Sequence, residues 1–368
     1  MMNGFTSILW IVMILCGHSV MAQGNARELF KFAKFKFDKG EYLAALDYVD
    51  RAIQADGSYA NAFLLRADIH YRQGEYEKTV ADLSTGLKSS SQSSMAYADY
   101  YLIRARSCLE LELYEKASAD LEILFNGTVQ NADAYYARAM LCHHRGDLKG
   151  ALDDLDRAIL MSSNVALYYL QRARIKEVQV SGGYRPDAYS NIFSDLSVAL
   201  ALDHENYAAY EMRSRLNQRM GQRAEAIADY SRMIELNTGD IRAYYERGVL
   251  KMQEYRYKEA IDDFGVVIQF NADDYLSRRN IAICYQNMEQ HQLAVREYSR
   301  AIRLMDDAVN ANAHQRELLG LFSETLLLRG HCYHLLHQPA DACHDFMLAY
   351  NLGNKKGLNY HRKYCSVY

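Results

Sequence analysis

The sequence has almost no proline, with two residues in 368. Proline removes a backbone hydrogen bond and clashes with the preceding helical turn, so its scarcity favours a chain that is helical nearly throughout. Strong charge of one sign is also missing: the formal net charge is −4, which argues against a dedicated nucleic-acid binder. Half of the residues are hydrophobic and thirty are tyrosines, which bury a ring while keeping the hydroxyl in water.

Sequence signatures of enzymes and metal sites are missing as well. The chain contains no G-x-S-x-G, H-E-x-x-H, P-loop or dinucleotide-binding fingerprint. It has seven cysteines but no C-x-x-C pair, so it contains neither a zinc ribbon nor a thioredoxin-like motif. We therefore expect a protein that is not an enzyme and that carries no cofactor.

A hydrophobic run long enough for a membrane span is missing too. The apolar run at residues 8–15 is shorter than the roughly 20 residues that cross a bilayer as a helix. Small residues follow at 20–22, so residues 1–22 are expected to be a secretory signal, although no Lys or Arg precedes the apolar run. Lipid attachment at Cys16 is the alternative. We expect an exported protein in the periplasm or at the cell surface, within a periplasmic or outer-membrane assembly, with no stable membrane span once the signal is removed.

The chain does contain an internal repeat. Residues 40–53, GEYLAALDYVDRAI, return at 146–159 as GDLKGALDDLDRAI, identical at eight of fourteen positions. A small residue within an apolar stretch recurs nine times, and we call these residues the anchors: Ala33, Ala67, Ala105, Ala139, Ala173, Ser214, Gly248, Ala282 and Gly330. Five of the eight steps between anchors are 34 residues, and the other three contain insertions. Each unit is predicted to form a helix, a turn often at glycine, and a second helix with its own small residue.

These units resemble the tetratricopeptide repeat family, through segments such as YYARAMLCHHRGDLKGALDDLDRAI and YYERGVLKMQEYRYKEAIDDFGVVI. The resemblance covers about residues 25–350, although the proline that usually closes each repeat is lacking. It implies an all-α, right-handed superhelical solenoid of about nine helix-turn-helix repeats over 23–350. A capping helix and tail would follow at 351–368, in a segment that resembles the ending of exported bacterial members. The resemblance also implies a non-catalytic scaffold that binds a peptide or protein partner.

Arginine directly precedes the anchor in seven repeats. An aspartate stands sixteen residues after the arginine in six of them, and twenty-three residues after it in the seventh, across an insertion. The two repeats without this arginine have Phe32 and Ile281, and their downstream equivalents are Tyr48 and Glu297. Because a guanidinium group can form two parallel bonds with a carboxylate, we predict that each arginine bonds the aspartate on its own second helix. A row of catalytic acids is the alternative.

In the family that the chain resembles, first helices line a concave groove that holds peptide segments. The positions three before, one after and four after each anchor share a helix face and are expected to line this groove. The predicted ligand-binding residues are Arg106, Tyr136, Met140, His143, Leu170, Arg174, Arg215, Tyr245 and Arg279. Arginines among aromatic and apolar groups predict an acidic or extended peptide as ligand. The alternative is that these are solvated helix residues without a ligand.

The last repeat gathers histidine and cysteine in GHCYHLLHQPADACHDF. Imidazole and thiolate bind zinc or copper, so His331, His334, Cys332 and Cys343 are candidate metal ligands. Tight ligand spacing is missing, and cysteines in such helices are commonly small buried apolar groups. A disulfide between Cys332 and Cys343 is a further alternative in an oxidising compartment. The second hypothesis for the function is therefore a metal- or redox-responsive binding protein.

Overall fold

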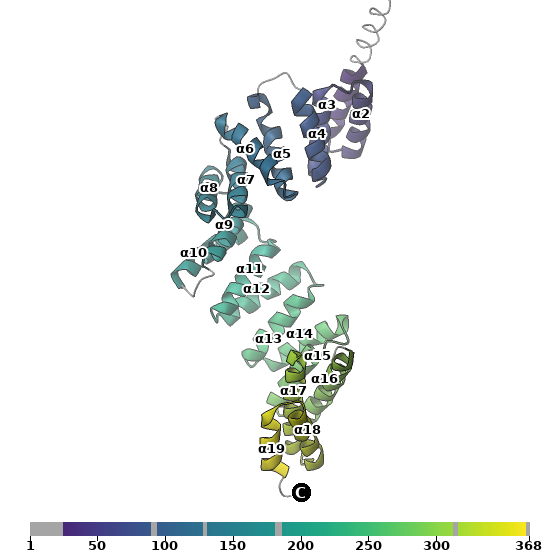
Figure 1. Cartoon of the computed structure of the whole chain (residues 1–368), viewed down its shortest axis with the longest axis vertical. Helices are drawn as coiled ribbons and strands as arrows, with labels where there is room; N and C mark the ends of the chain where they lie inside the picture. The colour runs from purple at the N-terminus through teal and green to yellow at the C-terminus, as the bar shows by residue number, and fades with distance from the viewer. Residues whose placement is uncertain (1–24, 90–93, 128–130, 181–185, 312–315, 366–368) are drawn as a thin grey trace, which may run out of the picture. The chain divides into compact units, whose positions relative to one another are not determined.

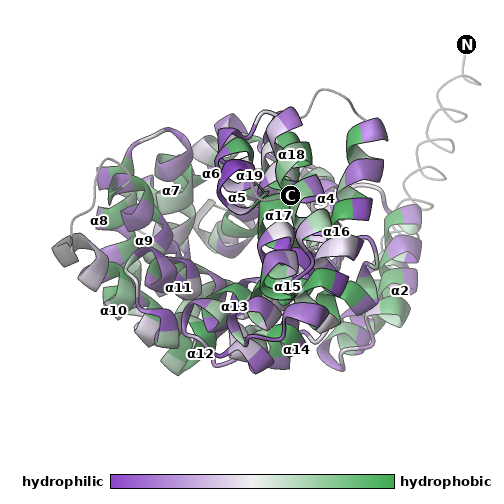
Figure 2. Cartoon of the chain, turned by 90° about the horizontal axis from the view of Figure 1, so that it is seen from below, coloured by the Kyte–Doolittle hydropathy of each residue, from purple (hydrophilic) through white to green (hydrophobic). Residues whose placement is uncertain are grey.

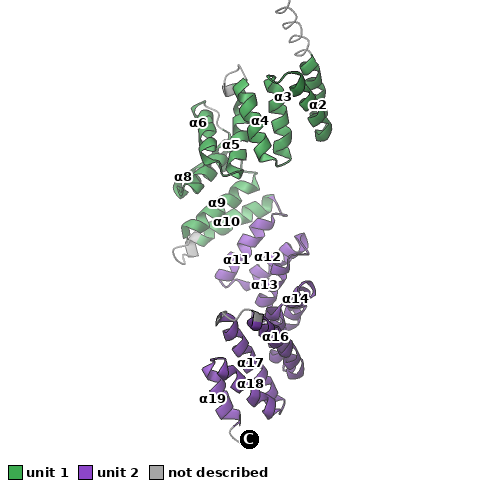
Figure 3. Cartoon of the chain, turned by 45° about the vertical axis from the view of Figure 1, so that its right-hand side comes forward, with its two compact units in different colours: residues 1–202 green, residues 203–368 purple. Residues whose placement is uncertain are grey.

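All regular elements of the described chain are helices, and the expected all-α fold is confirmed (Figure 1). The computed structural model describes residues 25–89, 94–127, 131–180, 186–311 and 316–365. The chain divides into two compact units, Met1–Leu202 (unit 1) and Asp203–Tyr368 (unit 2), and each is described by itself (Figure 3). The predicted signal at residues 1–22 lies outside the described residues.

Consecutive helices pack against each other within each unit. Unit 1 contains a helix at residues 25–38, α2 (Tyr42–Ala55), α3 (Ala60–Arg72), α4 (Tyr76–Ser89), η1 (Ser94–Tyr97), α5 (Ala98–Glu110), α6 (Tyr114–Asn126), α7 (Ala132–His144), α8 (Leu148–Met161), α9 (Ala166–Val180) and α10 (Pro186–Leu202). Unit 2 contains α11 (Tyr207–Arg219), α12 (Arg223–Leu236), α13 (Ile241–Gln253), α14 (Tyr257–Phe270), α15 (Tyr275–Asn287), α16 (His291–Ala311), α17 (Arg316–Leu335), α18 (Pro339–Asn351) and α19 (Lys355–Cys365). Within the described ranges, no helix has both the length and the apolar character needed to cross a membrane.

Two consecutive helices form one repeat. The described residues hold nine such pairs, from the helix at 25–38 with α2 to α17 with α18. All nine anchors are buried, as is the small residue predicted on the second helix of eight repeats. Figure 2 shows hydrophobic and hydrophilic residues along the same helices, as expected where one face of each helix packs on its neighbours. Such a pair is too small to bury its apolar faces alone, so neighbouring pairs stack.

Two anchors are glycine because a phenylalanine ring occupies the space beside them. A Cβ atom on Gly248 would lie 2.9 Å from the ring of Phe264, and one on Gly330 would lie 2.7 Å from the ring of Phe346. Both rings are fully buried. Because protein interiors are close-packed, the smallest anchors therefore pair with large rings on the second helix.

In eight of the nine repeats, the turn between the two helices has a left-handed backbone conformation seven residues after the anchor. Glycine occupies this position in four repeats, with φ between 73° and 79°. Glu112, Tyr255, Glu289 and His337 occupy it in four others, with φ between 57° and 61°. A side chain costs roughly 1–2 kcal/mol in this conformation, whereas glycine adopts it freely. The packing of the two helices therefore holds the turn even where its residue is unfavourable.

The predicted Arg–Asp pairs are present in all seven repeats. The pairs are Arg66–Asp82, Arg104–Asp120, Arg138–Asp154, Arg172–Asp195, Arg213–Asp229, Arg247–Asp263 and Arg329–Asp345. In the fourth repeat, Arg138 donates from Nε and Nη2 to the two oxygens of Asp154, both at 2.7 Å. The seven aspartates are buried, while the arginines remain partly exposed. These pairs tie the first helix of each repeat to its second helix.

Five of these arginines also donate from Nη1 to the second helix of the preceding repeat. Arg66 bonds Asp50 at 2.7 Å, and Arg247 bonds the Ser231 hydroxyl at 3.0 Å. The same contact joins Arg104 to Ser84, Arg172 to Asp156 and Arg329 to Ser299. In these five repeats, one guanidinium group therefore connects three helices and joins the repeat to the one before.

The two repeats without the arginine use other contacts at the same place. The rings of Phe32 and Tyr48 stack with centroids 5.8 Å apart. Glu297 is buried and instead pairs with Arg300 at 2.9 Å and with Arg278 at 3.6 Å, the latter from three positions before Ile281. The first exception therefore reflects direct contact between the two positions, whereas in the second Glu297 finds arginines at other positions.

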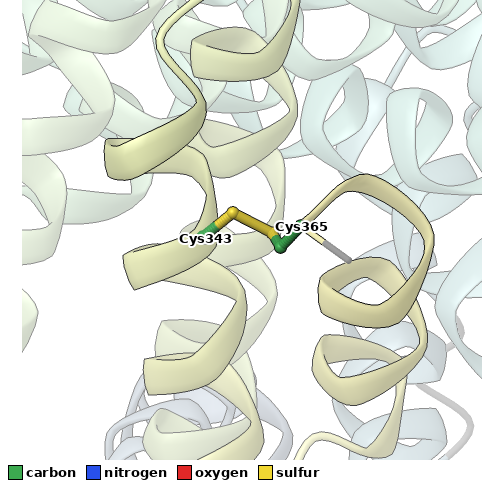
Figure 4. The surroundings of a disulfide bond; sticks show 2 residues. All are labelled: Cys343 and Cys365. Carbon is green, nitrogen blue, oxygen red and sulfur yellow. A yellow bond between two sulfur atoms is a disulfide. The ribbon is translucent and has the colours of Figure 1, made fainter. Parts of the chain in front are cut away.

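Helix α19 covers the apolar end of unit 2 and is joined to α18 by a disulfide between Cys343 and Cys365 (Figure 4). The alternative of a bridge between Cys332 and Cys343 is therefore excluded, because Cys343 is already paired. Cys332 is fully buried in the core around α17, whereas the Cα atoms of Cys343 and Cys365 lie 5.9 Å apart, within the range of a disulfide. The ring of Tyr360 on α19 packs 5.5 Å from that of Phe346.

Gly357 allows α19 to approach α18 closely. A Cβ atom at this position would lie 2.7 Å from the backbone nitrogen of Tyr350, which a side-chain rotation cannot relieve. The close packing of α19 on α18 therefore depends on glycine at position 357 as well as on the disulfide.

Candidate functional site

The first helices of four consecutive repeats in unit 1 line a pocket of about 670 Å³. It is formed by α3, α5, α7 and α9 together with the turn before α6 and the starts of α4 and α6. First helices of neighbouring repeats touch, α3 with α5 and α5 with α7, so side chains one repeat apart meet. The lining includes Tyr71, Tyr76, Arg106, Glu110, Glu112, Tyr114, Tyr136, Met140, His143, His144 and Leu167.

Four of the predicted ligand-binding residues meet in this pocket. Arg106 stands one position after its anchor on α5, and Tyr136, Met140 and His143 stand three before, one after and four after theirs on α7. The helix spacing therefore brings these side chains to one surface, as expected. Whether they bind a ligand stays a prediction.

The pocket is not cationic, because acidic groups surround its arginine. Arg106 Nη1 lies 3.6 Å from Asp133 Oδ2, and its guanidinium group lies 5.9 Å from the ring of Tyr71. Glu110 and Glu112 line the same pocket. The lining holds one guanidinium group and two carboxylates, and Asp133 also lies against Arg106. Arg174 is a second cation, close enough to act on Tyr136. This surface therefore attracts anionic ligands less than the sequence pattern suggested.

The tyrosines of this site are hydrogen-bond donors at neutral pH. Burial raises the pKa of Tyr71 and of Tyr136 above the usual range. Burial and a 2.7 Å hydrogen bond to Asp133 raise the pKa of Tyr168, whose ring stacks on Tyr136 with centroids 5.4 Å apart. Tyr168 and Arg106 therefore share Asp133, which fixes the wall of the pocket.

Leu170, by contrast, is only 4% exposed and does not line the pocket. It stands three positions before its anchor, like Tyr136. The equivalent Leu102 is also buried. Among the equivalent residues Leu102, Tyr136 and Leu170, only Tyr136 lines this pocket. Arg174 is exposed on α9, beside the lining residues Leu167 and Gln171.

The remaining three predicted residues belong to unit 2. Arg215 is partly buried on α11. Tyr245 packs edge-on against Phe264, with centroids 5.7 Å apart, and its hydroxyl accepts a bond from Asn280, so it is part of the packing of α13. Arg279 lines a separate pocket within unit 2.

Several lining residues were not predicted. Tyr71 lies four positions after its anchor, so extending the same spacing to the second repeat finds it. Glu112 and Tyr114 lie in and after the turn between α5 and α6. The predicted ligand-binding residues come from first helices alone. Glu112 and Tyr114 lie outside those helices, and only the folded turn brings them to the pocket.

The candidate metal ligands of the last repeat are not grouped around one position that could hold a metal ion. Cys343 is in the disulfide, and burial raises the pKa of Cys332 to about 12, which keeps that thiol protonated at neutral pH. His334 packs against Tyr364, with centroids 4.3 Å apart. Over the part of the chain that the structure describes, no three His, Cys, Asp or Glu side chains are grouped so as to hold a metal ion.

Family models match the N-terminal half of the repeat array. The model described as Tetratricopeptide repeat matches residues 102–164, and the model described as Anaphase-promoting complex, cyclosome, subunit 3 matches residues 38–124. A search of curated proteins finds no match to the sequence.

Solved structures of tetratricopeptide repeat proteins are similar in fold. The C-terminal part of a TPR repeat-containing protein from Cytophaga hutchinsonii is 16% identical, with a TM-score of 0.53, over 72% of this chain and 98% of that chain. A tetratricopeptide repeat protein from Parabacteroides merdae is 18% identical, with a TM-score of 0.48, over 71% of this chain and 99% of that chain. Sequence identities this low support a similar fold and do not indicate a similar function, which has to be argued from the site. With its nine helix pairs and buried anchors, the chain has the fold of tetratricopeptide repeat proteins, and the family model of that repeat matches residues 102–164.

Proposed function

We propose that the protein is a non-catalytic scaffold that binds an extended segment of a protein partner in the pocket of unit 1. Tetratricopeptide repeat chains are in general interaction scaffolds without catalytic activity. The observation that carries the proposal is the gathering of Tyr71, Arg106, Tyr136, Met140 and His143 from three consecutive first helices around one pocket. Half-buried tyrosines with a methionine supply apolar contact area at a surface that water still reaches.

The charges of the pocket define the kind of segment that fits. Asp133 lies against Arg106, and Glu110 and Glu112 carry further negative charge in or beside the lining. An acidic segment would place like charges together, which disfavours binding. The proposed ligand is therefore a neutral or basic extended segment with aromatic or aliphatic side chains, rather than the acidic peptide that the arginines alone suggest.

A peptide-display selection on the purified full chain tests this proposal. We expect selected peptides to be rich in aromatic and aliphatic residues and poor in Asp and Glu. Tyr71→Ala should weaken their binding by roughly tenfold or more, because aromatic anchors in the centre of a site carry about 2 kcal/mol each. The affinities are measured by fluorescence anisotropy with labelled peptides.

Asp153→Ala on α8 is the matched control, because Asp153 is exposed in the same unit and lies outside the pocket lining. It should leave the affinity unchanged. Selected peptides that bind the Tyr71→Ala and His143→Ala variants as tightly as the parent chain would refute this site.

We further infer that the chain is exported to the periplasm or the cell surface. Two observations support this: the apolar run at residues 8–15 followed by small residues at 20–22, and the Cys343–Cys365 disulfide, a bond that persists in oxidising compartments. Protein recovered from the periplasmic or surface fraction of its host should have the mass of a chain without residues 1–22. Its Cys343 and Cys365 should react with an alkylating agent only after reduction. An uncleaved chain with reactive thiols at both positions in the cytosolic fraction contradicts the inference.

A further inference from the structure

The first helix of unit 1, at residues 25–38, carries four phenylalanines that face in two directions. Phe30 and Phe37 are partly buried against the core of the first repeat, where the ring of Phe30 packs edge-on against Tyr59 with centroids 5.3 Å apart. Phe32 and Phe35 are 55% and 53% exposed. The packing of the repeat therefore accounts for two of the four rings and leaves the other two at the surface.

The two ends of the described chain differ in the character of their outer surface. A terminal repeat usually has a polar outer face, because no further repeat covers it. Helix α19 has this character, since its exposed residues are Lys355, Lys356, Asn359, Arg362 and Lys363. The helix at 25–38 instead exposes two phenyl rings, although the described residues contain no repeat before it. A surface of this kind is typical of a site that contacts another molecule.

Cationic groups lie over the rings of this surface. Lys39 Nζ lies 4.4 Å from the centroid of the Phe35 ring, and the guanidinium group of Arg51 lies 5.4 Å from that of Tyr48, on which Phe32 stacks. Phe32 and Phe35 are three residues apart and so are neighbours on the helix. We call this surface the N-terminal patch, and it consists of Lys31, Phe32, Phe35, Lys39, Tyr48 and Arg51.

Positive charge is in excess around the N-terminal patch, although the whole chain is acidic. Residues 25–39 contain five basic residues and two acidic ones. The ion pairs of Lys31 with Glu28 and of Lys34 with Asp38 have both side chains more than half exposed, so solvent weakens them. The lysines therefore remain available to an anionic surface.

We propose that the N-terminal patch docks unit 1 on an anionic lipid surface. Phe32 and Phe35 would enter the boundary between headgroups and acyl chains, and the cations around them would lie against lipid phosphates. Lysine beside phenylalanine on one helix is the composition of helices that lie in a membrane interface, and each cation near an anionic leaflet adds to the attraction.

Charge also argues against two other occupants of the N-terminal patch. A second copy docked through the same patch would bring two basic surfaces together, which disfavours that dimer. Residues 1–24 contain no Lys, Arg, Asp or Glu, so this segment offers no charge complement to the patch. Lipid docking goes beyond the function proposed above and uses none of the residues of the unit 1 pocket.

Flotation of the full chain with lipid vesicles tests the proposal. One vesicle contains equal parts of phosphatidylcholine and phosphatidylglycerol, and the other contains phosphatidylcholine alone. We expect binding to the anionic vesicle to be the tighter and to weaken as salt is added. Phe32→Ser/Phe35→Ser should weaken it roughly tenfold or more, because apolar area is no longer buried in the lipid. Lys31→Gln/Lys39→Gln should weaken it roughly tenfold, because two charges near the surface are lost.

Matched controls remove the same kinds of group elsewhere in unit 1. Leu160 is 86% exposed and Lys149 is exposed, both on α8, so Lys149→Gln/Leu160→Ser should leave vesicle binding unchanged. Tyr71→Ala should also leave it unchanged, which separates this proposal from that of the unit 1 pocket. All substituted residues of the N-terminal patch are exposed, and equal melting temperatures would confirm that the variants fold.

Three results would overturn the proposal. Binding that is equal for the two vesicles, and equal for the parent and Phe32→Ser/Phe35→Ser, assigns the lipid contact to the apolar run at residues 8–15. A parent chain that does not float with the anionic vesicle excludes a lipid surface as the occupant. A parent that sediments as a dimer without binding vesicles, while Phe32→Ser/Phe35→Ser sediments as a monomer, assigns the patch to a second copy.

Discussion

Asp154→Ala is expected to destabilise the protein by about 3 kcal/mol, whereas Asp153→Ala one residue earlier should change stability by no more than about 0.5 kcal/mol. Asp154 is 5% exposed and accepts two bonds from Arg138, while Asp153 is exposed on the same helix. Removing Asp154 strands a guanidinium group that packs 3.7 Å from the ring of Phe125. Breaking a buried pair costs about 3–5 kcal/mol, and the low end applies because Arg138 remains 32% exposed and water reaches it.

The measurement is thermal unfolding followed by far-UV circular dichroism. A loss of this size lowers the melting temperature by roughly 6–12 °C for a unit of about 180 residues. Repeat arrays unfold partly unit by unit, so the shift is read from the transition of unit 1. The two variants lose the same charge from neighbouring positions of one helix. Equal shifts in their melting temperatures would refute a structural role for the Arg–Asp pairs.

Loss of the Cys343–Cys365 disulfide is expected to release α19 from unit 2. The bond closes a loop of 22 residues, which corresponds to about 3 kcal/mol by the chain-entropy estimate, or roughly a hundredfold in the docking equilibrium. The helix has 11 residues, and an isolated helix of that length is marginal in water. What remains to hold α19 is mainly ring packing such as that of Tyr360 on Phe346.

Limited trypsin digestion measures this release, because α19 contains four cleavage sites, at Lys355, Lys356, Arg362 and Lys363. The double variant Cys343→Ser/Cys365→Ser should be cut at these sites much faster than the parent chain. A reducing agent should accelerate cleavage of the parent and leave the double variant unchanged. Cys142→Ser, in unit 1, is the control for the substitution itself. Resistance of α19 to trypsin in the double variant would show that packing alone holds the helix.

The anchors and the Arg–Asp pairs were predictable because each is a contact within one repeat. A 34-residue period places the partners at a constant separation, and nine copies in one chain show which positions change together. The exceptions at Phe32 and Ile281 were informative for the same reason, since their partners changed to Tyr48 and Glu297 and the structure places these residues in alternative contacts.

Contacts between repeats were predicted less well. The same position, three before the anchor, is buried at Leu170 and lines the pocket at Tyr136, and the spacing alone does not distinguish the two. The sequence also marked Arg106 as a cation for acidic ligands, but Asp133 lies against it from the next repeat. Periodicity does not show which side chain of the following helix turns toward a given residue.

The sequence by itself determined the repeating helix pairs, their small buried anchors and the Arg–Asp bonds. These depend on spacing within a repeat, and the repeat occurs nine times in the chain. Only the tertiary structure decided that Cys343 joins Cys365 rather than Cys332, and that Lys356 on the capping helix faces Arg279 across a pocket. These contacts occur once and join segments that share no period. They follow from how the last helix docks, which is determined by close packing at Gly357 and the rings around it rather than by any pattern along the chain.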